Sequence, residues 1–239
     1  DKIIDVFPGV DIERFYPLEH PRSLSGQAVR DHADFLNLPE SAFKEPHICE
    51  FGRSDSLKNK DRAVEVFAEV AKEVKNLSMF LNLDHHMEPA VAERIHQIIA
   101  EADLHDRVHV LSPDQLPQSG HGSDIMPNLL KTAKVFLTMS VMEGFGMAAC
   151  EAAASGVPVV GTRQIPVITD HIEPAGGGQA VDAYHIEEAA NAVCSYLAMD
   201  QGDYEAVCAR AYESVIPKFT WRTIVANMFE QMEEKGIRV

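Results

Sequence analysis

Short apolar runs alternate with longer amphipathic segments along most of the 239-residue chain, and this pattern restricts the possible folds more than any other feature. Such alternation is typical of parallel strands joined by crossover helices. We expect strands at residues 47–51, 77–83, 107–111, 134–139, 157–160 and 179–181. The sequence therefore predicts an α/β fold, a doubly wound, Rossmann-like sheet of five or six parallel strands. Ligands of such a sheet bind at the carboxyl ends of its strands.

The segments between these runs have the apolar spacing of helices. They lie at residues 61–75, 89–102, 125–133 and 147–154. After the last strand we expect extra C-terminal helices at residues 185–198, 204–215 and 223–235, with Pro217 separating the last two. Residues 17–46 and 112–124 carry the weakest signals for regular structure.

Composition excludes several classes of partner. The 21 Lys and Arg residues against 37 Asp and Glu residues give a net charge of −16, which disfavours nucleic acid but still permits a small anion in a locally basic cleft. No segment is long and apolar enough to cross a membrane, and the N-terminus lacks the layout of a signal peptide. The cysteines are widely spaced, as expected of free thiols, which favours a cytoplasmic location. They are Cys49, Cys150, Cys194 and Cys208.

A glycine-rich segment with a carboxylate at each end, Glu143 to Glu151, follows the fourth expected strand. Gly144 and Gly146 allow the backbone to approach a ligand closely, and the free amides at the start of the following helix attract anions. Either glutamate could instead merely cap the helix dipole. The segment is a candidate site for an anionic ligand.

Basic residues gather at the end of the first expected strand. Gly52 and Arg53 follow the strand, and Lys58, Asn59 and Lys60 precede the next helix. Arg53 and Lys58 suit a diphosphate, the first as a bidentate donor and the second as a point charge. A solvated loop is the alternative interpretation.

These segments together resemble one family in order and spacing. The chain is similar to the C-terminal, donor-binding lobe of retaining GT-B glycosyltransferases of family four, in particular the sucrose-phosphate synthase-like members. The similarity covers nearly the whole chain and is most specific between Glu143 and Thr162. The matching segments are Pro8 to Asp11 with Phe15 and Pro17, Gly52 and Arg53 with Lys58 and Asn59, Glu143 to Glu151, and Glu151 to Thr162.

The resemblance implies a nucleotide-diphosphate sugar as the donor substrate. Arg53 and Lys58 would neutralise its diphosphate and Glu143 would contact its hexose, so these three are the candidate catalytic residues. Glu151 would accept hydrogen bonds from the ribose. The backbone from Gly144 through Phe145 and Gly146 to Met147 would face the diphosphate or sugar, and Ser112 and Pro113 are candidates for contacting the nucleobase.

The same resemblance implies hexosyl transfer with retention, in which an oxygen of the leaving phosphate takes the proton of the acceptor. No Asp-x-Asp motif is present, so we expect no metal ion and no cofactor besides the donor. Residues 1–239 would form a single donor-binding domain. The N-terminal lobe that holds the acceptor is absent from this chain, and the acceptor is therefore unknown.

Three other interpretations are open. Gly144, Gly146 and Ala149 satisfy a G-x-G-x-x-A dinucleotide fingerprint, although it follows a late strand and no acidic residue ends the next one. The chain could also be a non-catalytic nucleotide-sugar-binding domain that works only with a partner lobe. The residues Asp84, His85 and His86 are metal-ligand types, but a polar loop is favoured because no further ligand has suitable spacing.

Overall fold

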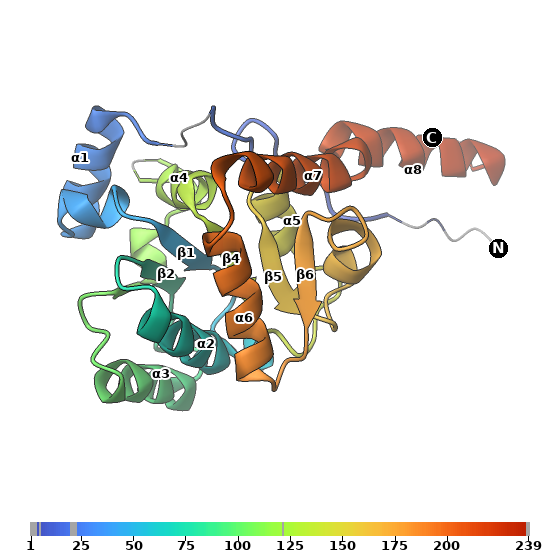
Figure 1. Ribbon diagram of the computed structural model, residues 1–239. Helices are drawn as coiled ribbons and strands as arrows, with labels where there is room; N and C mark the ends of the chain where they lie inside the picture. The colour runs from blue at the N-terminus through green and yellow to red at the C-terminus, as the bar shows by residue number, and fades with distance from the viewer. Residues whose placement is uncertain (1–3, 5, 20–22, 121, 238–239) are drawn as a thin grey trace.

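The computed structural model describes residue 4 and residues 6–19, 23–120 and 122–237. Its centre is a six-stranded sheet in the order β3-β2-β1-β4-β5-β6, and every neighbouring pair of strands is parallel. The strands are β1 (His47–Glu50), β2 (Ser78–Asn82), β3 (Val108–Leu111), β4 (Val135–Thr138), β5 (Val159–Thr162) and β6 (Gly178–Val181). The predicted doubly wound α/β sheet is confirmed (Figure 1). Residues 1–3, 5, 20–22, 121 and 238–239 of the predicted domain lie outside the described residues.

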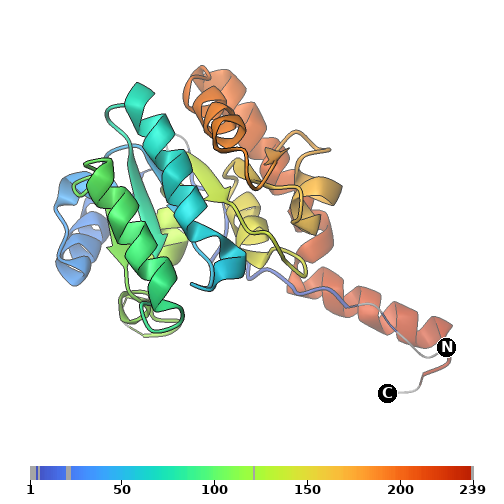
Figure 2. The same cartoon turned by 90° about the horizontal axis from the view of Figure 1, so that it is seen from below.

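Helices cover both faces of this sheet because each has one apolar stripe. One face carries α2 (Lys60–Glu73), α3 (Pro89–Glu101) and α6 (Ile186–Leu197), whose buried residues share a core with β1, β2 and β4. The opposite face carries α1 (Gly26–Leu36), α4 (Ile125–Thr132), α5 (Met147–Ala154) and most of the buried side of α7 (Gln201–Phe219). Figures 1 and 2 show these two layers.

The strand order changes direction at β1. The chain first adds β2 and β3 on one side of β1, and then adds β4, β5 and β6 on the other side. Residue Ile48 pairs with Met79 of β2 on one side and with Val135 of β4 on the other. The loops after β1 and β4 therefore leave the same edge of the sheet and diverge. This switch point is where ligands bind in open α/β sheets.

The segment 17–46, for which we expected little regular structure, contains a helix. The α1 helix begins after Ser25, whose side chain accepts a hydrogen bond from Ala28 N, and ends at Asn37 in the left-handed conformation. Its buried residues join the core on the α4 and α5 side. A short 3₁₀ turn, Glu40–Phe43, leads from it to β1.

The expectation that Pro217 separates the last two helices is wrong. Pro217 lies inside the last turn of α7, on an exposed side, and the chain breaks instead at Thr220, which caps α8 (Trp221–Glu234). Both views show α8 extending away from the sheet beside the N-terminal segment (Figures 1 and 2). Val10 attaches the N-terminal segment to the end of α7, just before α8, since its N–H donates to Phe219 O at 2.6 Å.

The described parts of the chain contain no helix that is both long and apolar enough to span a membrane. All four cysteines are free thiols; Cys49, Cys150 and Cys208 are buried and Cys194 is half-buried. This agrees with the prediction of free thiols.

Candidate functional site

A cavity of about 420 Å³ opens at the switch point, where the carboxyl ends of four strands meet. Its walls come from the loops after β1, β2, β3 and β4 and from the start of α5. Most of the residues predicted from the sequence line it: Arg53, Lys58, Pro113, Glu143, Gly146, Met147 and Glu151. The fold thus brings together residues that lie far apart in the chain.

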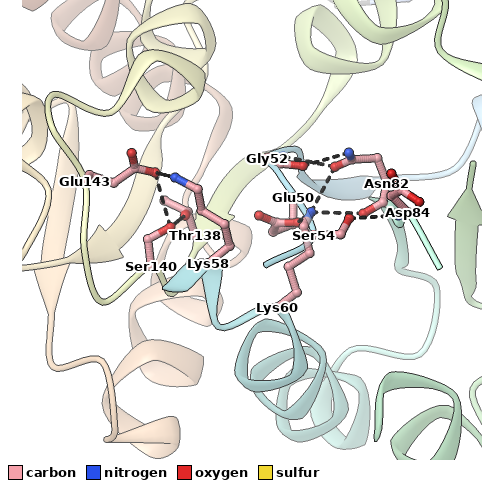
Figure 3. Close-up of polar contacts among 10 residues, drawn as sticks. All are labelled: Glu50, Gly52, Ser54, Lys58, Lys60, Asn82, Asp84, Thr138, Ser140 and Glu143. Atoms are coloured by element: carbon pink, nitrogen blue, oxygen red, sulfur yellow. Dashed lines mark hydrogen bonds and ion pairs between the residues drawn. The ribbon is translucent and has the colours of Figure 1, made fainter. Parts of the chain in front are cut away.

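Lys58 and Glu143 form an ion pair in the wall of this cavity. Lys58 Nζ lies 2.5 Å from Glu143 Oε1, and the two side chains are 11% and 21% exposed. Ser140 Oγ donates to the same oxygen at 3.3 Å. Lys58 ends a 3₁₀ turn, Ser56–Lys58, and the left-handed Asn59 that follows directs the chain into α2. Figure 3 shows Lys58 reaching across to the β4 side.

Arg53 stands at the open mouth of the cavity. Its side chain is 69% exposed, and its Nη2 lies 3.0 Å from Asp55 Oδ2. A surface ion pair of this kind contributes little to stability, so the guanidinium can exchange Asp55 for another anion at small cost.

Glu151 is a largely buried carboxyl in the first turns of α5. Its pKa is raised to about 7, mainly by burial; Arg14 opposes this shift and Asp11 adds to it. Among the residues with described positions, none donates a hydrogen bond to this carboxyl group. Glu151 therefore faces the cavity with no hydrogen-bond donor on its carboxyl group among the described residues.

The amino end of α5 also faces the cavity. The first helical hydrogen bond here runs from Cys150 N to Gly146 O at 3.0 Å, so the amides of Met147 and Ala148 precede it. Gly146 has a φ of 103°, and a Cβ on it would overlap the side chains of Ile165 and Val167. Only glycine fits this position, which leaves the helix N-terminus open to an anion.

Three predicted site residues do not line the cavity. Gly144 is exposed beside it, and the Phe145 ring packs against Phe7 and Phe219 with centroid distances of 5.6 Å and 4.8 Å. Ser112 is engaged with Gln115, whose Oε1 accepts from Ser112 N at 2.9 Å and Ser112 Oγ at 3.2 Å. Ser112 therefore lies in a closed turn next to the cavity, and its neighbour Pro113 lines the wall.

The sequence analysis missed a buried ion pair beneath the cavity. Lys60 Nζ donates to Glu50, and also to Asn82 O and Asn82 Oδ1, both at 2.9 Å. Burial lowers the pKa of Lys60 and raises the pKa of Glu50, while the attraction between them opposes both effects. The signal available in the sequence was a charged residue, Glu50, at the end of the short strand that begins at His47.

The chemistry of this arrangement suits an anionic ligand that also carries hydroxyl groups. Arg53, Lys58 and the α5 amides supply positive potential, whereas Glu143 and Glu151 supply hydrogen-bond acceptors. Within the described ranges, no group of three or more His, Cys, Asp or Glu side chains is placed to hold a metal ion.

Comparison with known proteins identifies the family of the chain. The sequence model of the family "Glycosyl transferases group 1" matches residues 38–213. A sucrose synthase from Thermosynechococcus vestitus is 25% identical over 88% of this chain and 26% of its own length. A D-inositol 3-phosphate glycosyltransferase from Pseudarthrobacter chlorophenolicus is 27% identical over 80% of this chain and 41% of its own length. The chain thus spans less than half of these relatives.

The fold is that of solved glycosyltransferases. A sucrose-phosphate synthase from Thermosynechococcus elongatus superposes with a TM-score of 0.72 and 24% identity, over 97% of this chain and 52% of that one. Because the family model covers most of the chain and the sheet matches that of this enzyme, the resemblance seen in the sequence is confirmed. The chain belongs to the group 1 glycosyl transferases and has the fold of a GT-B lobe, like the C-terminal lobe of sucrose-phosphate synthase-like members.

Proposed function

We propose that this chain is the donor-binding half of a retaining glycosyltransferase and that its cavity binds a nucleotide-diphosphate sugar. One observation carries the proposal: two cations, two carboxylates and a helix N-terminus from distant parts of the sequence converge on one cavity at the switch point. A diphosphate needs the cations and amides, and sugar hydroxyls need the carboxylates.

The donor would lie across the cavity from β4 toward β3. Its diphosphate would bind Arg53, Lys58 and the amides at the start of α5. Glu151 would accept hydrogen bonds from the ribose, and Glu143 would contact the hexose. The nucleobase would lie beside Pro113, which lines the far end of the cavity. Lys58 is bonded to Glu143 here, so the bound diphosphate would share this lysine with that carboxylate.

The proposed reaction breaks the bond between the anomeric carbon of the hexose and the diphosphate oxygen. The acceptor oxygen forms its bond on the same face of the sugar, and its proton passes to an oxygen of the leaving phosphate. Negative charge develops on the diphosphate in the transition state, and preorganised cations stabilise such charge. Arg53 and Lys58 are placed to do so without a metal ion, which supports a metal-independent mechanism with no cofactor besides the donor.

A second candidate is a nucleotide-sugar-binding lobe that does not catalyse transfer unless a separate lobe supplies the acceptor. The partial coverage of the relatives, 26% of the sucrose synthase and 41% of the inositol enzyme, favours it for residues 1–239 as a single domain. The acceptor would then be chosen by that partner lobe. The free, mostly buried thiols support a cytoplasmic location.

The dinucleotide alternative gains no support from the site. Its fingerprint follows β4, and β5 ends at Thr162 and Arg163 without the acidic residue that would bind a ribose.

Calorimetric titration of the chain with UDP, ADP and GDP, in EDTA and then with magnesium, tests the proposal. Anabaena HepE, which has the same fold with a TM-score of 0.72 and 18% identity, was crystallised with UDP-glucose, so UDP is the first probe. We expect metal-free binding of one nucleotide. If none of the three binds under either condition, the proposed function is wrong.

The placement of the diphosphate is tested by Arg53→Ala and Lys58→Ala. Each should weaken nucleotide binding by about 1.5–3 kcal/mol, the range for a hydrogen bond to a charged group. The matched control is Lys72→Ala, which removes an exposed lysine paired with Glu69 on the outer side of α2. Wild-type affinity in both cleft variants would show that the diphosphate binds elsewhere.

A further inference from the structure

The buried ion pair of Lys60 and Glu50 lies at the floor of the candidate cleft, where Glu50 is one of the lining residues. Lys60 is the first residue of α2 and its side chain is 0% exposed; Glu50 is the last residue of β1 and is 1% exposed. The ammonium group has three hydrogens, and it has three acceptors: the Glu50 carboxylate, Asn82 O and Asn82 Oδ1. The lysine is thus completely satisfied.

Stability alone does not account for this pair. Removing two charges from water costs several kcal/mol per ion, and replacing a buried ion pair with apolar residues of similar volume is often neutral or stabilising. Its neighbours in the chain, Ile48, Cys49, Ala63 and Val64, are fully buried and apolar, whereas the Lys60 ammonium contacts Glu50 and Asn82 at the cavity floor. Apolar residues at positions 50 and 60 would have extended this core.

Asn82 connects the ion pair to the loop that lines the cavity. The paired register of β1 and β2 ends with Glu50 opposite Leu81. Beyond it, the Asn82 side chain continues the connection: its Nδ2 donates to Gly52 O at 2.7 Å, and its Oδ1 accepts from Gly52 N at 2.9 Å. Lys60 holds that same Oδ1, which fixes the rotation of the amide.

The loop has a second attachment on the other side of Arg53. Ser54 is buried, and its Oγ accepts a hydrogen bond from Asp84 N at 2.8 Å. Gly52 and Ser54 are therefore both held to the end of β2, and all three residues of this loop line the cavity, with the exposed Arg53 side chain between the two attachments. Figure 3 shows the chain of contacts from Glu50 through Lys60 and Asn82 to Gly52, with Ser54 and Asp84 beside it.

We propose that the Lys60 and Glu50 pair is a positioning device for donor binding, which acts through Asn82 to fix the backbone of Gly52 and so the place from which Arg53 reaches the diphosphate. This inference rests on the proposed function for the identity of the ligand. The inference that the ion pair fixes the Gly52 backbone rests only on the hydrogen bonds among Lys60, Asn82 and Gly52. In this scheme Lys60 touches no ligand, in contrast to Lys58, and Glu50, which lines the cavity but is only 1% exposed, acts through its bond to Lys60.

The test replaces both charges with apolar residues of similar size, Glu50→Leu with Lys60→Met. We expect a chain that unfolds at a urea concentration close to that of the wild type. Its Gly52 amide should nevertheless exchange its hydrogen at least about tenfold faster, because the amide of Asn82 is no longer oriented. Nucleotide affinity should fall about tenfold, as expected when one or two hydrogen bonds that order a binding loop are lost.

A second variant and a matched control make the test decisive. Asn82→Ala removes the connecting side chain but keeps the ion pair, and it should produce the same two losses even if the apolar pair fails to fold. Glu69→Leu with Lys72→Met makes the same substitutions at an exposed ion pair of α2, 2.6 Å long, and should change neither readout.

The outcomes separate this inference from the proposed function. The positioning role would be refuted if the Gly52 amide exchanged its hydrogen at the wild-type rate and nucleotide affinity stayed at the wild-type value, both in Glu50→Leu with Lys60→Met and in Asn82→Ala. Loss of affinity with an unchanged Gly52 amide would also refute it, because the effect would not pass through the loop. If the unaltered chain binds no nucleotide, the proposed function fails, and exchange at Gly52 still decides whether the pair holds the loop.

Discussion

Glu151 offers a prediction that does not depend on any ligand. Burial raises the pKa of this carboxyl from an ordinary value of 4.5 to about 7. In the unfolded chain the same group has its ordinary pKa. The folded protein therefore binds more protons than the unfolded chain between these two pH values, and its stability must fall as the pH rises through this range.

The size of the effect follows from the two pKa values. One unit of pKa corresponds to about 1.4 kcal/mol, so the free energy of unfolding should lose about 3 kcal/mol in total as Glu151 ionises. The stabilisation is complete below pH 4.5 and is lost as the pH passes 7. Between pH 5.5 and pH 8.5 the loss should be about 2 kcal/mol. Glu151→Gln keeps the shape of the side chain but cannot ionise, so it should avoid this loss.

Urea unfolding of the wild type and of Glu151→Gln, followed by far-ultraviolet circular dichroism at both pH values, measures the difference. We expect the variant to gain about 2 kcal/mol relative to the wild type between pH 5.5 and pH 8.5. Glu93→Gln, on the exposed face of α3, shows what the same substitution does at the surface. An equal stability difference at both pH values would refute the idea that burial makes ionisation of Glu151 costly.

Three further outcomes follow from the site and from α7. Glu143→Ala should bind UDP at least as tightly as the wild type, because Lys58 loses its carboxylate partner, but should bind UDP-glucose about tenfold more weakly; calorimetry would contradict this if both affinities fell equally. Gly146→Ala should destabilise the fold by about 2–4 kcal/mol in thermal unfolding, since its φ of 103° and the Ile165 side chain exclude a Cβ. Pro217→Ala should stabilise the chain by about 1 kcal/mol, because it restores one helical N–H in the last turn of α7 at an exposed position; a lower urea midpoint would count against it.

The sheet was predictable because its strands are buried on both faces. In a strand such as Val135–Thr138, neither face points to solvent, so apolar and polar residues do not alternate. The strand therefore appears in the sequence as a short, continuous apolar segment. The order of runs and amphipathic segments then fixes the parallel connections, and with them the edge at which Arg53, Glu143 and Glu151 meet. The cavity was thus expected from topology before any distance was known.

The helix α1 and the end of α7 were not predictable by the same reasoning. Only four residues of α1 are buried, among them His32, so its apolar stripe is interrupted by a polar residue. In α7, Pro217 removes one N–H in the last turn, where the helix is about to end and little else is lost. Packing against the core forms α1 despite its weak apolar pattern. The position of Pro217 near the helix end allows α7 to continue through a residue that usually breaks a helix.

Lys58 and Lys60 show most clearly what a sequence cannot settle. They stand two residues apart, on either side of the left-handed Asn59, and the structure sends them in different directions: Lys58 to Glu143 after β4, and Lys60 to Glu50 at the end of β1. Spacing alone assigns both to the same basic loop. What separates them is the partner that each finds, and Glu50 becomes a partner only once α2 has packed over β1. Tertiary contacts therefore distinguish Lys58, which can meet a ligand, from Lys60, which holds the loop. Their substitutions should act differently: Lys58→Ala should weaken nucleotide binding directly, and loss of Lys60 should weaken it through Gly52.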